Sequence, residues 1–142
     1  MLKEVTIYTQ SLIENLSETG LAESSEKNES EAVGTLRYDS DVISISYTEM
    51  IEGTKVSTRI TVAENYVKVA RRGGVECDFE FCEGQATTAI YKVPPYSFDA
   101  EIFTRKIRSS LTDNGAEISL VYDMTVGGIG KKTNMKIRVR EK

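Results

Sequence analysis

Apolar and polar residues alternate with a period of two along most of this chain. The pattern is clearest from Val75 to Phe81, where apolar residues at odd positions are separated by acidic residues at even positions. Successive side chains of a β-strand point to opposite faces, so such a segment has one apolar face and one polar face. No competing helical period is present, and the pattern therefore predicts an all-β protein.

Turn residues divide the alternation into ten β segments. Gly73-Gly74 predicts a tight turn, Pro94-Pro95 marks a break or a sheet edge, and a shift of the pattern near Phe103-Thr104 indicates a β-bulge. The segments are 4–16, 33–39, 42–50, 54–63, 66–71, 75–82, 85–93, 96–111, 118–126 and 135–139. A chain of 142 residues with this regular spacing is the size of one domain, 1–142.

Short turns between consecutive strands favour an antiparallel up-and-down arrangement. An open sheet of about eight to ten strands would leave two edges and one apolar face in water, and closure into a barrel removes both problems. A two-sheet sandwich is the alternative. A barrel of about eight strands is either filled by its own side chains or holds one small ligand.

Residues 17–31 interrupt the pattern. This segment is rich in Ser and Glu and has no apolar period, so we expect a mobile acidic loop there. A helix is the alternative, although it would have almost no apolar face to bury.

Composition excludes several kinds of chemistry. The chain has no His and only two cysteines, Cys77 and Cys82, which argues against a metal site, and neither a cofactor nor a redox motif is present. A net charge of −4 and a pI near 5.0 argue against nucleic-acid binding. The sequence contains neither a signal peptide nor an apolar run of membrane-spanning length, so we expect a cytoplasmic protein without a membrane partner.

Several segments resemble the YwiB-like family, which consists of small uncharacterised bacterial proteins. The resemblance covers most of the chain and is carried by residues 63–75, 89–96, Thr104 and 115–124. It implies a calycin-like (lipocalin-like) β-barrel of unknown function. Because one fold serves many functions, the resemblance implies a fold more than an activity.

Arg71 is the first candidate for a binding residue. It shares its parity with Val67 and Val69, so its side chain is expected to point into the barrel near a strand end. A guanidinium there could grip a carboxylate or phosphate. The alternative is that Arg71 bonds loop carbonyls and caps the barrel end.

Four further residues could orient a polar head group inside a cavity. Tyr122 and Tyr47 belong to apolar series, and Tyr91 and Thr104 could assist them. The alternative for the tyrosines is simple core packing.

Two charged series have simpler explanations than a site. The acids at 76, 78 and 80 are expected to be solvated, since a general acid needs a buried or coupled neighbour. The basic stripe at 136, 138 and 140 could contact RNA phosphates, but it equally suits a solvated outer face.

The sequence therefore predicts a non-enzymatic protein that binds a small, partly apolar or anionic ligand inside the barrel. A structural or protein-interaction module with a solidly packed barrel is the alternative, and a homodimer stays open. The interior volume separates the two readings.

Overall fold

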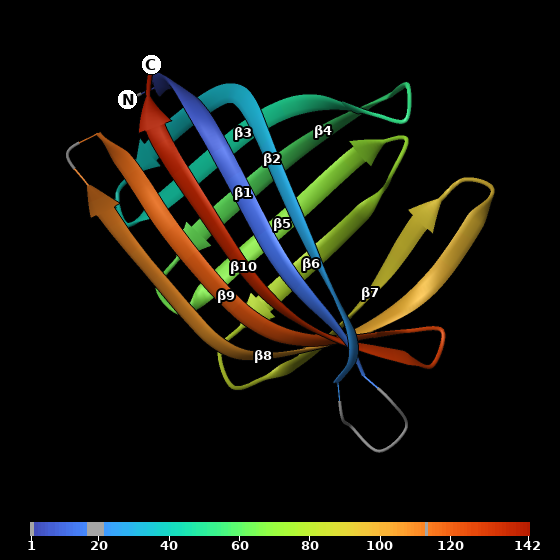
Figure 1. Ribbon diagram of the computed structural model, residues 1–142. Coiled ribbons are helices and arrows are strands. Elements are labelled where there is room, and N and C mark those ends of the chain that lie inside the picture. The colour runs from blue at the N-terminus through green and yellow to red at the C-terminus, as the bar shows by residue number, and fades with distance from the viewer. Residues whose placement is uncertain (1, 17–21, 113) are drawn as a thin grey trace.

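The computed structural model describes residues 2–16, 22–112 and 114–142, and this part of the chain contains ten β-strands and no helix. Each strand pairs antiparallel with its neighbours in a single sheet, which curls into a nearly closed barrel (Figure 1). The strands are β1 (Leu2–Leu16), β2 (Ala22–Asp39), β3 (Val42–Ile51), β4 (Thr54–Ala63), β5 (Tyr66–Gly73), β6 (Cys77–Cys82), β7 (Ala86–Val93), β8 (Tyr96–Thr112), β9 (Gly115–Val126) and β10 (Ile129–Glu141). The all-β up-and-down prediction is confirmed.

The apolar series of the strands fill the barrel. In β9, for example, Ala116, Ile118, Leu120 and Tyr122 are buried, whereas Glu117 between the first two is exposed. Equivalent positions of β1, β3, β4, β5, β6 and β10 join them in one core. Side-chain alternation therefore determines which side chains of each strand are removed from water.

The first and last strands of the chain pair with each other. The sheet runs β6-β5-β4-β3-β2-β1-β10-β9-β8-β7, and β1 pairs with β10 from Val5↔Glu141 to Asn15↔Lys131. The backbone N–H of Lys142 also donates to the carbonyl of Glu4 at 3.2 Å. This junction seals one side of the barrel (Figure 1).

The strands β6 and β7 form the two edges of the sheet, and they meet with little backbone pairing. In the described part of the chain one bridge links them, between Glu76, just before β6, and Lys92 of β7, which exchange backbone hydrogen bonds of 2.9 and 2.8 Å. Farther along, Thr87 donates its hydroxyl to the carbonyl of Glu80 at 2.6 Å. Beyond β6, Gly84 and Gln85 bond Thr104 of β8 instead.

The structure corrects the prediction of a loop over 17–31. Residues 22–31 belong to β2, whose ladder with β1 extends to Leu16↔Ala22, while residues 17–21 lie outside the described residues. The side chains from Ser25 to Glu31 are all exposed, because this end of the β1–β2 hairpin extends beyond the core. Backbone pairing without burial leaves no apolar period, so the sequence pattern could not reveal this strand.

The predicted bulge in the long strand β8 is confirmed. The register of β8 with β9 shifts between Thr104 and Lys106. The backbone N–H of Ile107, just past the shift, donates to the Glu83 carboxylate at 2.9 Å. The bulge restores the inward face, so that Ala100, Ile102, Thr104 and Ile107 are all buried.

Candidate functional site

A row of inward-facing residues crosses five strands near one end of the barrel. The strand registers align Gly34 of β2, Tyr47 of β3, Thr58 of β4, Arg71 of β5 and Cys77 of β6. A methyl group on Gly34 would collide with the Ser46 carbonyl oxygen and lie 2.8 Å from the Cβ of Tyr47. Glycine at this position thus lets β2 and β3 approach closely beside the Tyr47 ring.

Arg71 places a positive charge inside this row. Its charge acts on Tyr47, Cys77 and Tyr122, which come from β3, β6 and β9, so the guanidinium lies among three separate strands. Its Nε is buried and has no hydrogen-bond partner in the described residues. The ion pairs of the same residues do not include Arg71.

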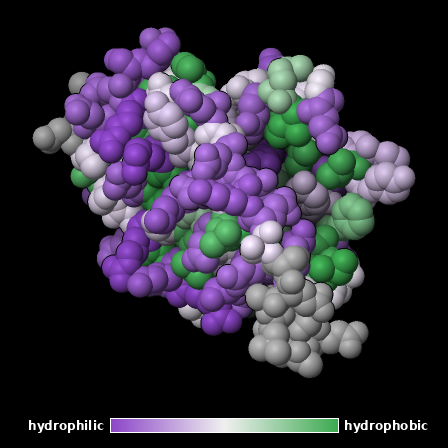
Figure 2. All heavy atoms as spheres, in the orientation of Figure 1, coloured by the Kyte–Doolittle hydropathy of each residue, from purple (hydrophilic) through white to green (hydrophobic). Residues whose placement is uncertain are grey.

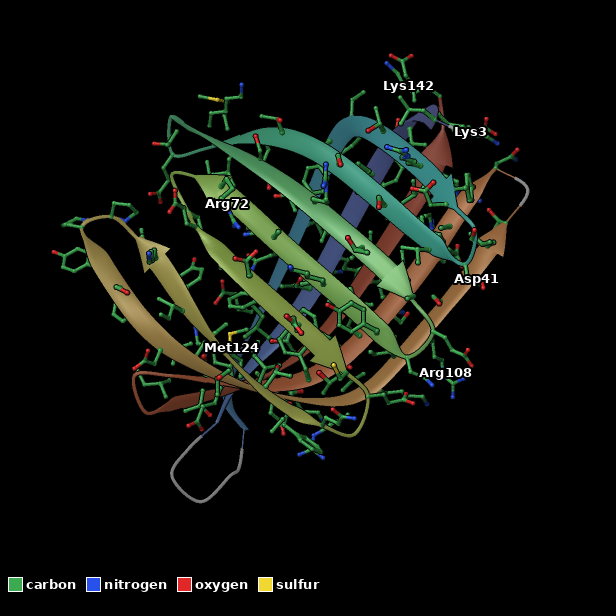
Figure 3. The ribbon with its side chains drawn as sticks, turned by 180° about the vertical axis from the view of Figure 1, so that it is seen from behind. Lys3, Asp41, Arg72, Arg108, Met124 and Lys142 are labelled. Carbon is green, nitrogen blue, oxygen red and sulfur yellow. The ribbon has the colours of Figure 1, made fainter. Side chains whose placement is uncertain are left out.

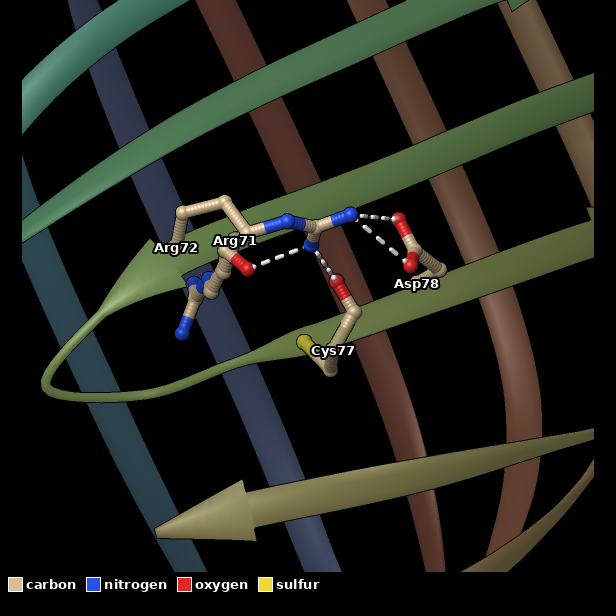
Figure 4. A network of polar contacts seen from close by, with 4 residues as sticks. All are labelled: Arg71, Arg72, Cys77 and Asp78. Carbon is tan, nitrogen blue, oxygen red and sulfur yellow. Dashed lines mark hydrogen bonds and ion pairs between the residues drawn. The ribbon is translucent and has the colours of Figure 1, made fainter. Parts of the chain in front are cut away.

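The neighbouring Arg72 points to the other face and is fully engaged (Figure 4). Its Nη2 donates to both carboxylate oxygens of Asp78 at 3.0 Å. Its Nη1 donates to the carbonyls of Arg71 and Cys77 at 2.7 and 3.2 Å. This network ties β5 to β6 on the outside and leaves Arg71 on the inside.

The groups around Arg71 are held in their neutral forms. Burial raises the pKa of Tyr47 and of the Cys77 thiol, and the Arg71 charge lowers each by a smaller amount. Burial also raises the pKa of Tyr122, against smaller lowering effects of a hydrogen bond with Thr133 and of Arg71. At neutral pH these side chains are hydrogen-bond donors without charge. Glu49, half-buried on the inward side of β3, also raises the pKa of Tyr47.

The five predicted site residues all face inward. Thr104 is fully buried beside Tyr122 in the β8–β9 register, and its Oγ1 has no hydrogen-bond partner in the described residues. Tyr91 is half-buried and stacks on Phe79, with ring centroids 6.0 Å apart. The structure thus brings Arg71, Tyr47 and Tyr122 together. Their binding role stays a prediction.

Sequence reasoning did not single out Gly34 and Phe79, which lie beside the predicted site residues Tyr47 and Tyr91. Their inward parity was visible, but the β2–β3 register that sets Gly34 against Tyr47, and the ring stacking of Phe79 on Tyr91, depend on contacts between strands.

A pocket of about 230 Å³ enters the opposite end of the barrel. Its walls include the core residues Ile43, Val62 and Ile118, and its rim includes Asp41. Figure 3 shows Asp41 and Arg72 at opposite ends of the molecule. None of the five predicted site residues lines this pocket.

The charged series on the outer face are paired or solvated. Asp78 and Glu80 are exposed, and Asp78 bonds Arg72. Arg138 and Arg140 of the basic stripe both contact Glu117 of β9 at 3.4 Å. The described residues contain no cluster of three or more potential metal-binding Cys, Asp or Glu side chains. They also contain no helix with the length and hydropathy that a membrane span requires.

Comparison with known proteins supports the fold and leaves the activity undefined. The family described as a domain of unknown function (DUF1934) matches residues 13–139. The uncharacterized beta-barrel protein YwiB of Bacillus subtilis (strain 168) is 36% identical over 83 residues, a region that spans 58% of this chain and 58% of that protein. The crystal structure of the ywiB protein from Bacillus subtilis superimposes with a TM-score of 0.86 at 28% identity, covering 99% of this chain and 93% of that chain. These relatives indicate no catalytic family.

Proposed function

We propose that this chain, which belongs to the DUF1934 family of unknown function, is a non-catalytic protein that binds a small, partly apolar anion in its barrel. The observation that carries the proposal is the inward-facing Arg71, whose buried Nε has no partner in the described residues. Arg71 as a whole is half-buried, but a buried guanidinium N–H without a partner is costly. A carboxylate or phosphate would complete its hydrogen bonds in a planar, bidentate geometry.

The surroundings of Arg71 suit an anion. The side chains of Tyr47, Tyr122 and Cys77 are neutral at physiological pH, because burial raises the pKa of each. They can donate hydrogen bonds to an anionic group without repelling it. The Glu49 carboxylate would repel an anionic ligand. Glu49 is half-buried nearer the barrel end and stays partly solvated, and solvent weakens this repulsion.

The test is calorimetric titration of the full chain with three carboxylates of different shape, namely decanoate, naphthoate and decahydronaphthoate. At least one should bind, and Arg71→Met should weaken that binding about tenfold or more, the magnitude of a lost charge-assisted hydrogen bond. Arg72→Met is the matched control, because it removes the same charge from the outer face one residue away.

Two results would overturn the proposal. One is that none of the three acids binds, which would favour the alternative of a packed barrel that acts as a structural or interaction module. The other is that both arginine variants weaken binding equally, which would indicate general attraction to a positive surface. Native mass spectrometry of protein from its own cells would report any bound mass and the number of subunits.

A further inference from the structure

Aromatic side chains on the same face of four neighbouring strands follow one another in a row, called here the aromatic track. Rings pair from Tyr96 to Phe98 (centroids 6.5 Å apart), from Tyr91 to Phe79 (6.0 Å), from Phe79 to Phe81 (6.5 Å) and from Phe81 to Tyr122 (4.7 Å). Tyr91 and Phe98 are direct cross-strand partners in β7 and β8, which joins the first pair to the rest. The track therefore crosses from β8 through β7 and β6 to β9.

The outer residues of this track are exposed and the inner ones are buried. Tyr96 is 66% exposed and Phe98 is 41% exposed, Tyr91 and Phe79 are half-buried, and Phe81 is 1% exposed. The inner end is Tyr122, on which the charge of Arg71 acts. The track thus leads from solvent toward Arg71, whose buried Nε has no partner in the described residues.

The outer part of the track lies on a hairpin that projects beyond the rest of the sheet. The ladder between β8 and β9 begins at Ala100↔Val126, so Tyr96 and Phe98 pair with β7 alone (Figure 1). Figure 2 shows hydrophobic side chains on the side where this hairpin projects, next to a hollow in the surface. The hairpin keeps its apolar face toward the barrel end although no strand of the barrel covers it.

We infer that the anion held by Arg71 carries a planar aromatic body, which lies against this aromatic track. This inference rests on the proposed function and specifies its ligand class. The Phe79–Tyr91 and Tyr96–Phe98 rings are close to parallel within each pair, at 16° and 27°, an arrangement that a further flat ring can extend. Face-to-face contact with offset aromatic rings favours a flat π-system beyond the effect of buried area alone.

The test compares naphthoate with decahydronaphthoate, which has the same carbon skeleton and charge but no flat aromatic face. We expect naphthoate to bind the full chain about five- to tenfold more tightly. Phe98→Leu should abolish this preference while decahydronaphthoate binding is retained. Phe103→Leu is the matched control, because Phe103 lies on the outward face of the same strand with the same 41% exposure as Phe98.

The outcomes separate the inference from the proposed function. If both acids bind equally and depend on Arg71, the aromatic inference is overturned and the proposed function stands. If naphthoate is preferred but Phe98→Leu and Phe103→Leu act alike, the track does not select the ligand and the inference is overturned. If neither acid binds, the aromatic inference is overturned. Decanoate binding and its dependence on Arg71 then test the proposed function.

Discussion

The interior around Arg71 and the outer face around Arg72 differ in how charge is handled, although one peptide bond separates the two residues. Outside, Arg72 has four hydrogen bonds, two of them to a carboxylate. Inside, Arg71 lies near the neutral side chains of Tyr47 and Tyr122, with the Glu49 carboxylate also acting on Tyr47, and its Nε lacks a partner in the described residues. Stability explains the outer arrangement, whereas the inner one has a cost that is typical of residues retained for function.

The largest expected difference between the two faces concerns packing. Phe81→Ala should lower the free energy of unfolding by about 3–5 kcal/mol, because Phe81 is fully buried and its loss leaves a cavity. Phe103→Ala on the outer face should cost about 0.5 kcal/mol or less. Urea denaturation of both variants measures this. Equal losses would show that the inner face is not the core of the fold.

The two arginines should respond to methionine substitution with opposite signs. Arg71→Met should raise the free energy of unfolding by about 1 kcal/mol, because it removes the buried Nε that has no partner in the described residues and leaves an apolar chain of similar length. Arg72→Met should lower it by about 1 kcal/mol or less, the usual contribution of an exposed ion pair. Urea denaturation without ligand is the measurement. A loss of stability in Arg71→Met would mean that the cation supports the fold.

The smallest expected effect is a dependence of stability on alkaline pH. The folded-state pKa of Tyr47 and of Tyr122 is raised by burial, so their contribution to stability is complete below the unfolded-state pKa near 10. As pH rises above about 10, the unfolded chain loses these protons first, and stability falls. Tyrosinate absorbance of the folded chain should show that Tyr47 and Tyr122 ionise above their ordinary pKa, together with the loss of folded structure. Ionisation of both at their ordinary pKa in the folded chain would place the inner tyrosines in contact with water.

Much of the fold could be predicted from the sequence, because alternation reports burial directly. Ten segments, the bulge near Phe103-Thr104 and the inward position of Arg71 all follow from the parity of apolar residues. The extension of β2 through residues 22–31 could not be predicted, because backbone ladders hold it while its side chains from Ser25 to Glu31 are exposed.

The arrangement of the candidate site was less accessible to sequence reasoning. Parity indicates that Arg71 and Tyr47 face inward, but the registers that align them come from hydrogen bonding across three strands. The near-absence of pairing between β6 and β7 has no sequence signal either. Consecutive strands joined by a short turn usually pair, and here the Gly84 and Gln85 backbone bonds β8 instead.

The junction between β1 and β10 has a consequence for the connectivity of this protein. The order of the sheet from β7 through β10 and β1 to β6 follows the chain without a jump once the two ends are joined. A circularly permuted gene that links the ends near Glu4 and Lys142 and starts at Ala86 would therefore place every paired strand next to its neighbour in sequence. Every strand ladder of the described residues would then join neighbours in sequence, and the sparse contacts of β6 and the following turn with β7 and β8 would become long-range instead. Because the ladders outnumber these contacts, the permuted chain should fold faster than the natural one.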